Sequence, residues 1–324
     1  MTKVNVAGID ISKKFFDVCM ITNGEHQQKQ FTNDATGIKA AAQWLKKEVH
    51  CVMEVTGCYY MRLALYLQQH GFRVSVVNPL IIKRFSQMRL IRAKTDKADA
   101  NMIALYATAE QPEAWTAPHQ YSVTLQQLDG ISEQLSKQHT ALSNQLEAFT
   151  QSGMIEKGTK QLLLKSLKLI RQQQHSVEKK TDELIRKYHG ELIGCLTTIP
   201  GLGNKTAAML IVITDGFKKF SSHKQLSAYV GISPRIFESG SSIRGKTKLC
   251  KMGMSRIRAL LYVCAWSAKR CNRACKQLYD RLLEKGKAKK QALMAVANKL
   301  LKQAFAMAKT KENYNAGYVK NICL

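Results

Sequence analysis

Two aspartates three residues apart, Asp96 and Asp99, are the first candidates for a chemical role in this sequence. They lie in the segment KTDKADA, residues 94–100, where a helix is predicted to begin and to run over residues 98–109. On a helix this spacing places both carboxylates on one face, where two like charges are unfavourable unless a cation lies between them. Mg²⁺ is the obvious cation, because it is hard and prefers oxygen ligands. A solvated first turn whose aspartates complement the helix dipole explains the pair equally well.

Asp10 and Glu54 add two more carboxylates, and both interrupt apolar segments that are predicted to be strands. A carboxylate inside a strand is unfavourable unless it is paired or binds a metal ion, although either acid alone fits a strand edge that faces water. Asp10, Glu54, Asp96 and Asp99 together form a set of four acids, which lie on two predicted strands and one predicted helix. Metal-bound carboxylates of this kind polarise a phosphate and stabilise the attacking and leaving oxygens. The arrangement resembles the ribonuclease-H-like fold of the RuvC type, in which such carboxylates hold Mg²⁺ for phosphodiester chemistry, and this resemblance implies a Mg²⁺ or Mn²⁺ site here.

The elements that must position these acids predict an α/β domain over residues 1–110. Three strands are expected first, at residues 4–12, 15–21 and 27–32. Helices at residues 36–48 and 59–70 then alternate with strands at residues 51–55 and 73–77. Antiparallel strands followed by alternating helices and strands predict one sheet with helices on its faces.

Residues 111–190 predict a linker and two long helices. The linker is expected at residues 111–119, which contain Pro112 and Pro118. Apolar residues then recur every seven positions on either side of Gly153. They are Leu128, Leu135, Leu142 and Phe149 before it, and Leu163, Ile170, Val177 and Leu184 after it. This repeat predicts a helical hairpin or a pair of coiled-coil helices. Its nearly balanced charge favours dimerisation, and an internal spacer is the alternative.

The charge of the chain is strongly positive and unevenly distributed. The formal net charge is +27, and residues 191–324 hold 25 basic and 6 acidic side chains. Such a field favours a polyanion, so nucleic acid is the expected partner. No apolar run is long enough to span a bilayer and no signal peptide is recognisable, so no membrane partner is expected. Nine cysteines without paired metal spacing predict free thiols in a reducing bacterial cytoplasm.

The segment IPGLGNKTA, residues 199–207, leads into an apolar helix that is predicted at residues 208–213. Gly201 and Gly203 permit a tight turn, and amides exposed at the helix N-terminus can hold a phosphate, with Lys205 beside them. The segment is similar to a helix-hairpin-helix element, which grips a nucleic-acid backbone without reading its sequence.

A segment rich in glycine and serine, residues 231–253, is predicted to be a loop. Its polar side chains are three serines between two arginines, followed by three lysines. They are Arg235, Ser239, Ser241, Ser242, Arg244, Lys246, Lys248 and Lys251. A serine hydroxyl becomes a nucleophile when a base or a metal assists its deprotonation, and guanidinium groups can stabilise charge that builds on phosphorus. Composition alone favours a basic loop that contacts DNA phosphates.

Seven motifs occur in one order and span nearly the whole chain: GIDISKKFFDV, EVTG, VVNP, KTDKADA, IPGLGNKTA, PRIFESGSSIRG and KMG. In these motifs the chain resembles the DEDD transposases of bacterial insertion sequences, the one-ten family, which includes the pilin-gene invertases and the bridge-RNA-guided recombinases. The resemblance implies α/β and all-α parts: a RuvC-like (ribonuclease-H-like) domain over residues 1–110, a coiled coil within residues 111–190, and a mostly helical transposase domain over residues 191–324. Met254 after KMG is a departure, since a polar residue is more usual there.

The resemblance also implies roles for single residues. The metal ligands fall on Asp10, Glu54, Asp96 and Asp99, and the nucleophile falls on Ser239, directly before Gly240, with Ser241 as the second choice. The serine would form a phosphoserine link that a free 3′ hydroxyl resolves. The implied partners are target and donor DNA, a noncoding bridge RNA, and further copies of the chain in a dimer, or in a tetramer on DNA.

Two other function classes compete with this interpretation. In a junction-resolving endonuclease the four acids hydrolyse DNA, and the serine loop only binds phosphate. A non-catalytic nucleic-acid-binding protein leaves the acids in the strands unexplained. A covalent link between protein and cut DNA separates the recombinase from both.

Overall fold

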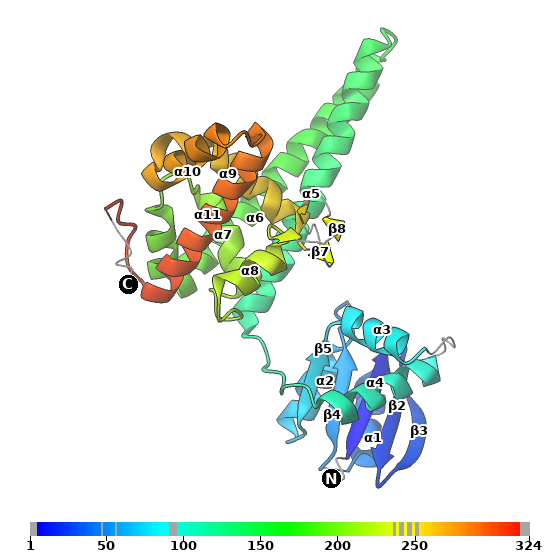
Figure 1. Cartoon of the computed structure of the whole chain (residues 1–324). Coiled ribbons are helices and arrows are strands. Elements are labelled where there is room, and N and C mark those ends of the chain that lie inside the picture. The colour runs from blue at the N-terminus through cyan, green and yellow to red at the C-terminus, as the bar shows by residue number, and fades with distance from the viewer. Residues whose placement is uncertain are drawn as a thin grey trace, which may run out of the picture. The chain divides into compact units, whose positions relative to one another are not determined.

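The computed structural model describes residues 5–46, 48–55, 57–90, 96–235, 238–239, 243–244, 248–249 and 253–317. For residues 96–97, 235, 238–239, 243–244 and 248 it describes the backbone alone. The chain divides into two compact units, Met1–Pro118 and His119–Leu324 (Figure 1). Within the described ranges, no helix is both long and apolar enough to cross a membrane.

The first unit contains one five-stranded sheet, as the alternating pattern of the sequence predicts. Its strands are β1 (Val6–Ile11), β2 (Phe15–Thr22), β3 (Glu25–Thr32), β4 (His50–Glu54) and β5 (Val74–Val77), in the order β3-β2-β1-β4-β5. The first three strands pair antiparallel, and β1, β4 and β5 pair parallel. The carboxyl ends of the three parallel strands therefore meet at one edge of the sheet.

Helices cover both faces of this sheet and separate two cores. On one face α1 (Ala35–Trp44) and α2 (Met61–Gln69) pack on Ile9, Met53 and their neighbours. On the other face α3 (Pro79–Met88) and α4 (Asp96–Glu110) pack on Val6, Val52 and their neighbours. Successive side chains of a strand point to opposite faces. The even-numbered residues of β1 and β4 consequently face α3 and α4.

Gly8 of β1 allows α4 to lie unusually close to the sheet. A Cβ atom at this position would overlap the carbonyl oxygen of Ala100 and the amide nitrogen of Ala104. Only glycine, which has no side chain, permits this approach of two backbones. The contact sets the distance between β1 and the helix that carries Asp99.

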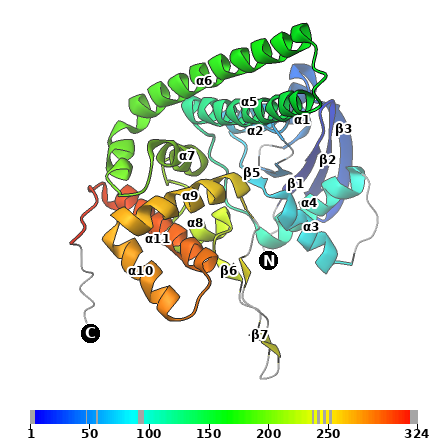
Figure 2. The same cartoon turned by 90° about the horizontal axis from the view of Figure 1, so that it is seen from above.

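The second unit begins with a long helical hairpin, which the seven-residue repeat predicts. Its helices are α5 (Gln120–Gln151) and α6 (Lys157–Thr197), which lie side by side (Figure 2). Gly153 has a positive φ of 70° in the connection between them. Leu128 and Leu135 of the repeat are buried, whereas Phe149 near the tip is exposed. A supercoiled geometry for this pair stays a prediction.

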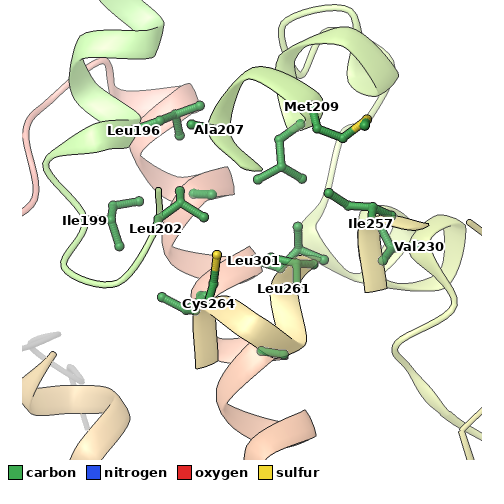
Figure 3. Packing of buried hydrophobic residues seen from close by; sticks show 14 of the residues in the cluster. Leu196, Ile199, Leu202, Ala207, Met209, Val230, Ile257, Leu261, Cys264 and Leu301 are labelled. Carbon is green, nitrogen blue, oxygen red and sulfur yellow. The ribbon is translucent and has the colours of Figure 1, made fainter. Parts of the chain in front are cut away.

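The remainder of the second unit is a helical bundle. It contains α7 (Asn204–Thr214), α8 (His223–Val230), α9 (Ser255–Cys271), α10 (Arg273–Glu284) and α11 (Lys289–Thr310). Their apolar side chains meet in one core, in which Leu202, Leu261 and Leu301 converge (Figure 3). The segment predicted as a loop contains four two-residue strands: β6 (Pro234–Arg235), β7 (Glu238–Ser239), β8 (Ile243–Arg244) and β9 (Lys248–Leu249).

Candidate active site

Asp10 and Glu54 lie at the carboxyl ends of two neighbouring parallel strands. Ile9 of β1 is paired with Met53 of β4, so each acid is the next residue after this pair. Both acids are half-buried. Because Ile9 and Met53 pack in the core under α1 and α2, the two acids point to the opposite face, which α4 covers.

The direction of α4 brings its first turn toward the same edge of the sheet. The chain after α4 lies beside the start of β5, where the Ser75 hydroxyl donates to the carbonyl oxygen of Glu113 at 2.6 Å. The Trp115 amide likewise donates to the carbonyl oxygen of Val74 at 2.7 Å. The last turn of α4 therefore lies near the amino end of β5. The middle of the helix passes over Gly8, and its first turn lies toward the edge where the parallel strands end. That beginning carries Asp96 and the half-buried Asp99.

The donor atoms at these four positions are of the kind that a hard divalent cation prefers. All four carry carboxylates, which Mg²⁺ accepts together with water molecules. Among the side chains that the structure describes, no three acidic, histidine or cysteine groups gather closely enough to hold an ion. The side chain of Asp96 lies outside the described residues. The four-acid metal site therefore remains a proposal, which the arrangement of β1, β4 and α4 supports.

Asp17 is a fifth carboxylate near this edge, and the sequence analysis did not single it out. It is paired with Asp10 in the antiparallel β1–β2 ladder, and its side chain is only 7% exposed. Gln30 Nε2 donates to Asp17 Oδ2 at 3.0 Å from the neighbouring strand. The signal was present in the sequence, because Asp17 breaks an apolar run in the same way as Asp10.

The structure describes part of the backbone around the predicted nucleophile. Ser239 in β7 pairs with Ile243 in β8, and Glu238 pairs with Arg244. Arg235 in β6 pairs with Lys248 in β9. Ser241, Ser242, Lys246 and Lys251 lie outside the described residues. The described pairs make Ser239 part of a short antiparallel hairpin, and the role of its hydroxyl stays a prediction.

The IPGLG segment forms the turn before α7, and its two glycines differ in their surroundings. Gly201 has a φ of 92°, and a Cβ atom there would lie 2.6 Å from Cα of Ala268 on α9. Its lack of a side chain is therefore required by packing. Gly203 is the exposed N-cap of α7, with open space around it. Lys205 Nζ lies 3.2 Å from Glu178 Oε1, an exposed pair that contributes little stability. Phosphate binding at this helix end stays a prediction.

Several cations of the second unit make contacts within the protein. Arg256 Nη1 lies 2.6 Å from Asp129 Oδ1 on α5, and both side chains are partly buried. Burial raises the pKa of Asp129, and the Arg256 guanidinium opposes that rise. Arg258 Nη1 donates to the carbonyl oxygen of Val230 at 2.9 Å, and Lys269 Nζ lies 4.1 Å from the centre of the Trp266 ring. Some cations of α9 are thus used to hold the second unit together.

Comparison with known proteins gives similarity over nearly the whole length. A family model for DEDD transposases of IS110, described as Transposase, matches residues 7–154. A second, described as Transposase IS116/IS110/IS902 family, matches residues 194–280. The chain is 31% identical to a pilin gene-inverting protein of Moraxella lacunata, over 95% of this chain and 97% of the relative. It is 24% identical to a transposase for insertion sequence element IS1111A of Coxiella burnetii, over 98% and 93% of the two chains.

Proposed function

The chain belongs to the IS110 family of transposases, and we propose that it exchanges DNA strands through a covalent serine intermediate. Transposases cut and rejoin DNA, so DNA is the substrate. The serine part of this proposal rests on the position of Ser239 in the motif PRIFESGSSIRG. The observation that carries its metal-dependent part is the gathering of acid-bearing positions at one sheet edge. Asp10 and Glu54 follow paired residues of parallel strands, and the first turn of α4 begins toward the same edge.

We assign Asp10, Glu54, Asp96 and Asp99 as the residues that would hold Mg²⁺ or Mn²⁺. Such an ion, when bound, stabilises the negative charge of the phosphate and of the attacking and leaving oxygens. The proposal includes a ribonuclease-H-like fold of the RuvC type for the first unit. The mixed five-stranded sheet, with its acids on the face that α4 covers, supports this proposal.

Ser239 is the proposed nucleophile. Its Oγ forms a bond to phosphorus while the bond from phosphorus to the 3′ oxygen breaks, and the serine proton ends on the released 3′ hydroxyl. A 3′ hydroxyl of another strand then attacks the phosphoserine and restores the serine, so the number of phosphodiester bonds is conserved. Arg244, in the strand β8 that pairs with the strand of Ser239, and Arg235, in β6, would stabilise the charge on phosphorus. The acids and Ser239 belong to different units, so the active centre needs both units, from one copy or from two.

The proposed partners are target and donor DNA, a noncoding bridge RNA and further copies of the chain. The 25 basic side chains of residues 191–324 support nucleic-acid binding. Leu162 and Leu169, one heptad apart on α6, are 66% and 56% exposed, which supports a homo-oligomer through the hairpin. Replacing both by glutamine should lower the oligomeric state in analytical ultracentrifugation. An unchanged sedimentation coefficient would exclude this surface as the interface.

Strand cleavage with single acid variants tests the proposed metal site. Asp10→Ala, Glu54→Ala, Asp96→Ala and Asp99→Ala should each abolish cleavage and leave DNA binding largely intact, because losing one ligand disrupts a hard-cation site while the basic unit is unchanged. Glu25→Ala, an exposed acid of β3, is the matched control and should cut normally. Cleavage at the parent rate by three of the four variants would refute the assignment.

A further inference from the structure

A groove of about 530 Å³ lies between α10 and α11. The two helices run beside each other in the bundle (Figure 2). Each helix contributes four residues at the spacing i, i+3, i+4, i+7, from Ala274 to Arg281 on α10 and from Ala295 to Lys302 on α11. This spacing places each set on one helical face. Two of the lining residues are alanines, whose small side chains leave the groove open between the helices.

The described residues that line the groove include three cations and no carboxylate. Arg281 lies on one wall, and Lys299 and Lys302 lie on the other. Among the described residues, none of the three forms an ion pair, whereas Arg256 and Lys205 are each paired with an acid. The cavity beside that Arg256 pair has carboxylates in its wall, including Glu178. Three cations without a partner favour an anion in the α10–α11 groove.

The rest of the lining combines neutral polar side chains with apolar ones. Leu278 and the two alanines supply apolar groups, and Gln277 and Asn298 supply side-chain amides. The Ser227 hydroxyl donates to Asn298 Oδ1 at 3.0 Å, which fixes this amide and leaves its Nδ2 as a donor. Grooves that bind single strands combine cations along the backbone with a surface, usually aromatic, on which bases stack. Here the three cations supply the first part, and an apolar surface of Leu278 and the two alanines stands in place of the aromatic one.

We propose that the α10–α11 groove binds a single-stranded segment of nucleic acid, with its phosphates at Arg281, Lys299 and Lys302. A cavity of this size is typical of pockets for small ligands. It therefore has room for a short stretch of single strand and is too small to enclose a duplex. The inference rests on the proposed recombinase function, because strand exchange and RNA guidance both present unpaired nucleotides to the protein. It adds to that function a site for those nucleotides outside the serine loop.

Salt dependence of binding tests the groove, because each phosphate contact on a single strand contributes about 0.7 to the slope of log K against log salt. A protein carrying Arg281→Gln, Lys299→Gln and Lys302→Gln should therefore lose about 2 from the slope for single-stranded oligonucleotides. The control carries Lys287→Gln, Lys289→Gln and Lys290→Gln, which removes the same charge from exposed positions outside the lining. Fluorescence anisotropy would be measured with single-stranded and duplex DNA and RNA of one sequence.

The proposal is supported if the groove variant loses more of the salt slope on single strands than it loses on duplexes, and more than the control variant loses on single strands. Equal losses in the groove and control proteins overturn the proposal, and so does an equal loss on single strands and duplexes. The single variant Lys302→Gln, at an exposed position, should lose about 0.7 and excludes a folding defect as the cause. A preference for the RNA or the DNA strand identifies which one occupies the site. Repeating the binding measurements in a Ser239→Ala protein separates the two proposals. The groove contribution to the salt slope should persist in that protein, whether or not it still cleaves DNA.

Discussion

Asp17 lies directly opposite Asp10 across the antiparallel β1–β2 pair, on the face of the sheet that α4 covers. Like charges at directly opposed positions destabilise a sheet by about 0.2–1 kcal/mol. We expect Asp17→Asn to stabilise the metal-free protein by about that amount and to reduce the stabilisation that Mg²⁺ provides. Asparagine can still accept the hydrogen bond from Gln30. Thermal melting with and without Mg²⁺ measures both effects, with Glu25→Gln as the control. If Asp17→Asn instead destabilises the protein by the same amount with and without Mg²⁺, Asp17 has a structural role only.

His50 makes the stability of the first unit depend on pH. The side chain is 3% exposed, and burial lowers its pKa to about 4. Ser75 Oγ donates to the carbonyl of Glu113, so it accepts from His50 Nε2 at 2.7 Å. His50 Nδ1 is buried and has no hydrogen-bond partner among the residues that the structure describes. A proton on Nδ1 is therefore unfavourable in the folded state.

The unfolded chain takes up this proton near pH 6.5, and the folded chain takes it up only near pH 4. Stability should therefore fall as the pH drops from about 6.5 to 4, by up to about 3 kcal/mol, and this contribution should be constant above and below that window. His50→Gln should remove the dependence. Urea unfolding would be followed by fluorescence of Trp44 and Trp115 in a Trp266→Phe background. A parent and a variant with parallel pH profiles would contradict the argument.

Gly8→Ala should displace α4 from β1. The added methyl group would overlap the backbone of Ala100 and Ala104, and forcing extra atoms into a packed core costs typically 1–3 kcal/mol. Because α4 carries Asp99, Mg²⁺-dependent stabilisation should fall together with the free energy of unfolding. Gly130→Ala is the control, since nothing lies near the added atom in α5, and it should stabilise the protein by up to about 1 kcal/mol. Normal stability and normal Mg²⁺ response in Gly8→Ala would show that the contact does not position the helix.

The periodicity of the sequence predicted the five strands and the helices α1, α2 and α4 of the first unit, because burial on one or two faces dictates an alternating or helical repeat, whereas α3 was not predicted. Asp10 was found because it interrupts such a repeat, and Asp17 was missed although it does the same. The pairing of Asp17 with Asp10 depends on the register of two strands, which the repeat alone does not specify. The short strands around Ser239 were predicted as a loop, since glycine and serine dominate there and each strand is two residues long.

Other features arise only from tertiary packing. The close passage of α4 over Gly8 needs the helix and the strand together, and glycine by itself indicated no partner. Trp115 in the predicted linker donates its amide to Val74 and holds this segment against the sheet. The groove between α10 and α11 likewise depends on two helices meeting at their alanine-bearing faces. Sequence reasoning found the basic composition of this region, but it did not separate cations paired within the protein from those that are unpaired.

Detection of a covalent protein–DNA adduct tests the central claim, a serine nucleophile, most directly. The reaction would be trapped with a nicked or mismatched DNA substrate, denatured, and mapped by mass spectrometry. The account predicts an adduct that survives denaturant and maps to Ser239, and a Ser239→Ala protein that binds DNA but loses both adduct and cleavage. Loss of the adduct in Ser241→Ala alone would move the nucleophile by two positions. Absence of any adduct in the parent, with cleavage retained in Ser239→Ala, Ser241→Ala and Ser242→Ala, would contradict the serine mechanism and establish a hydrolytic endonuclease.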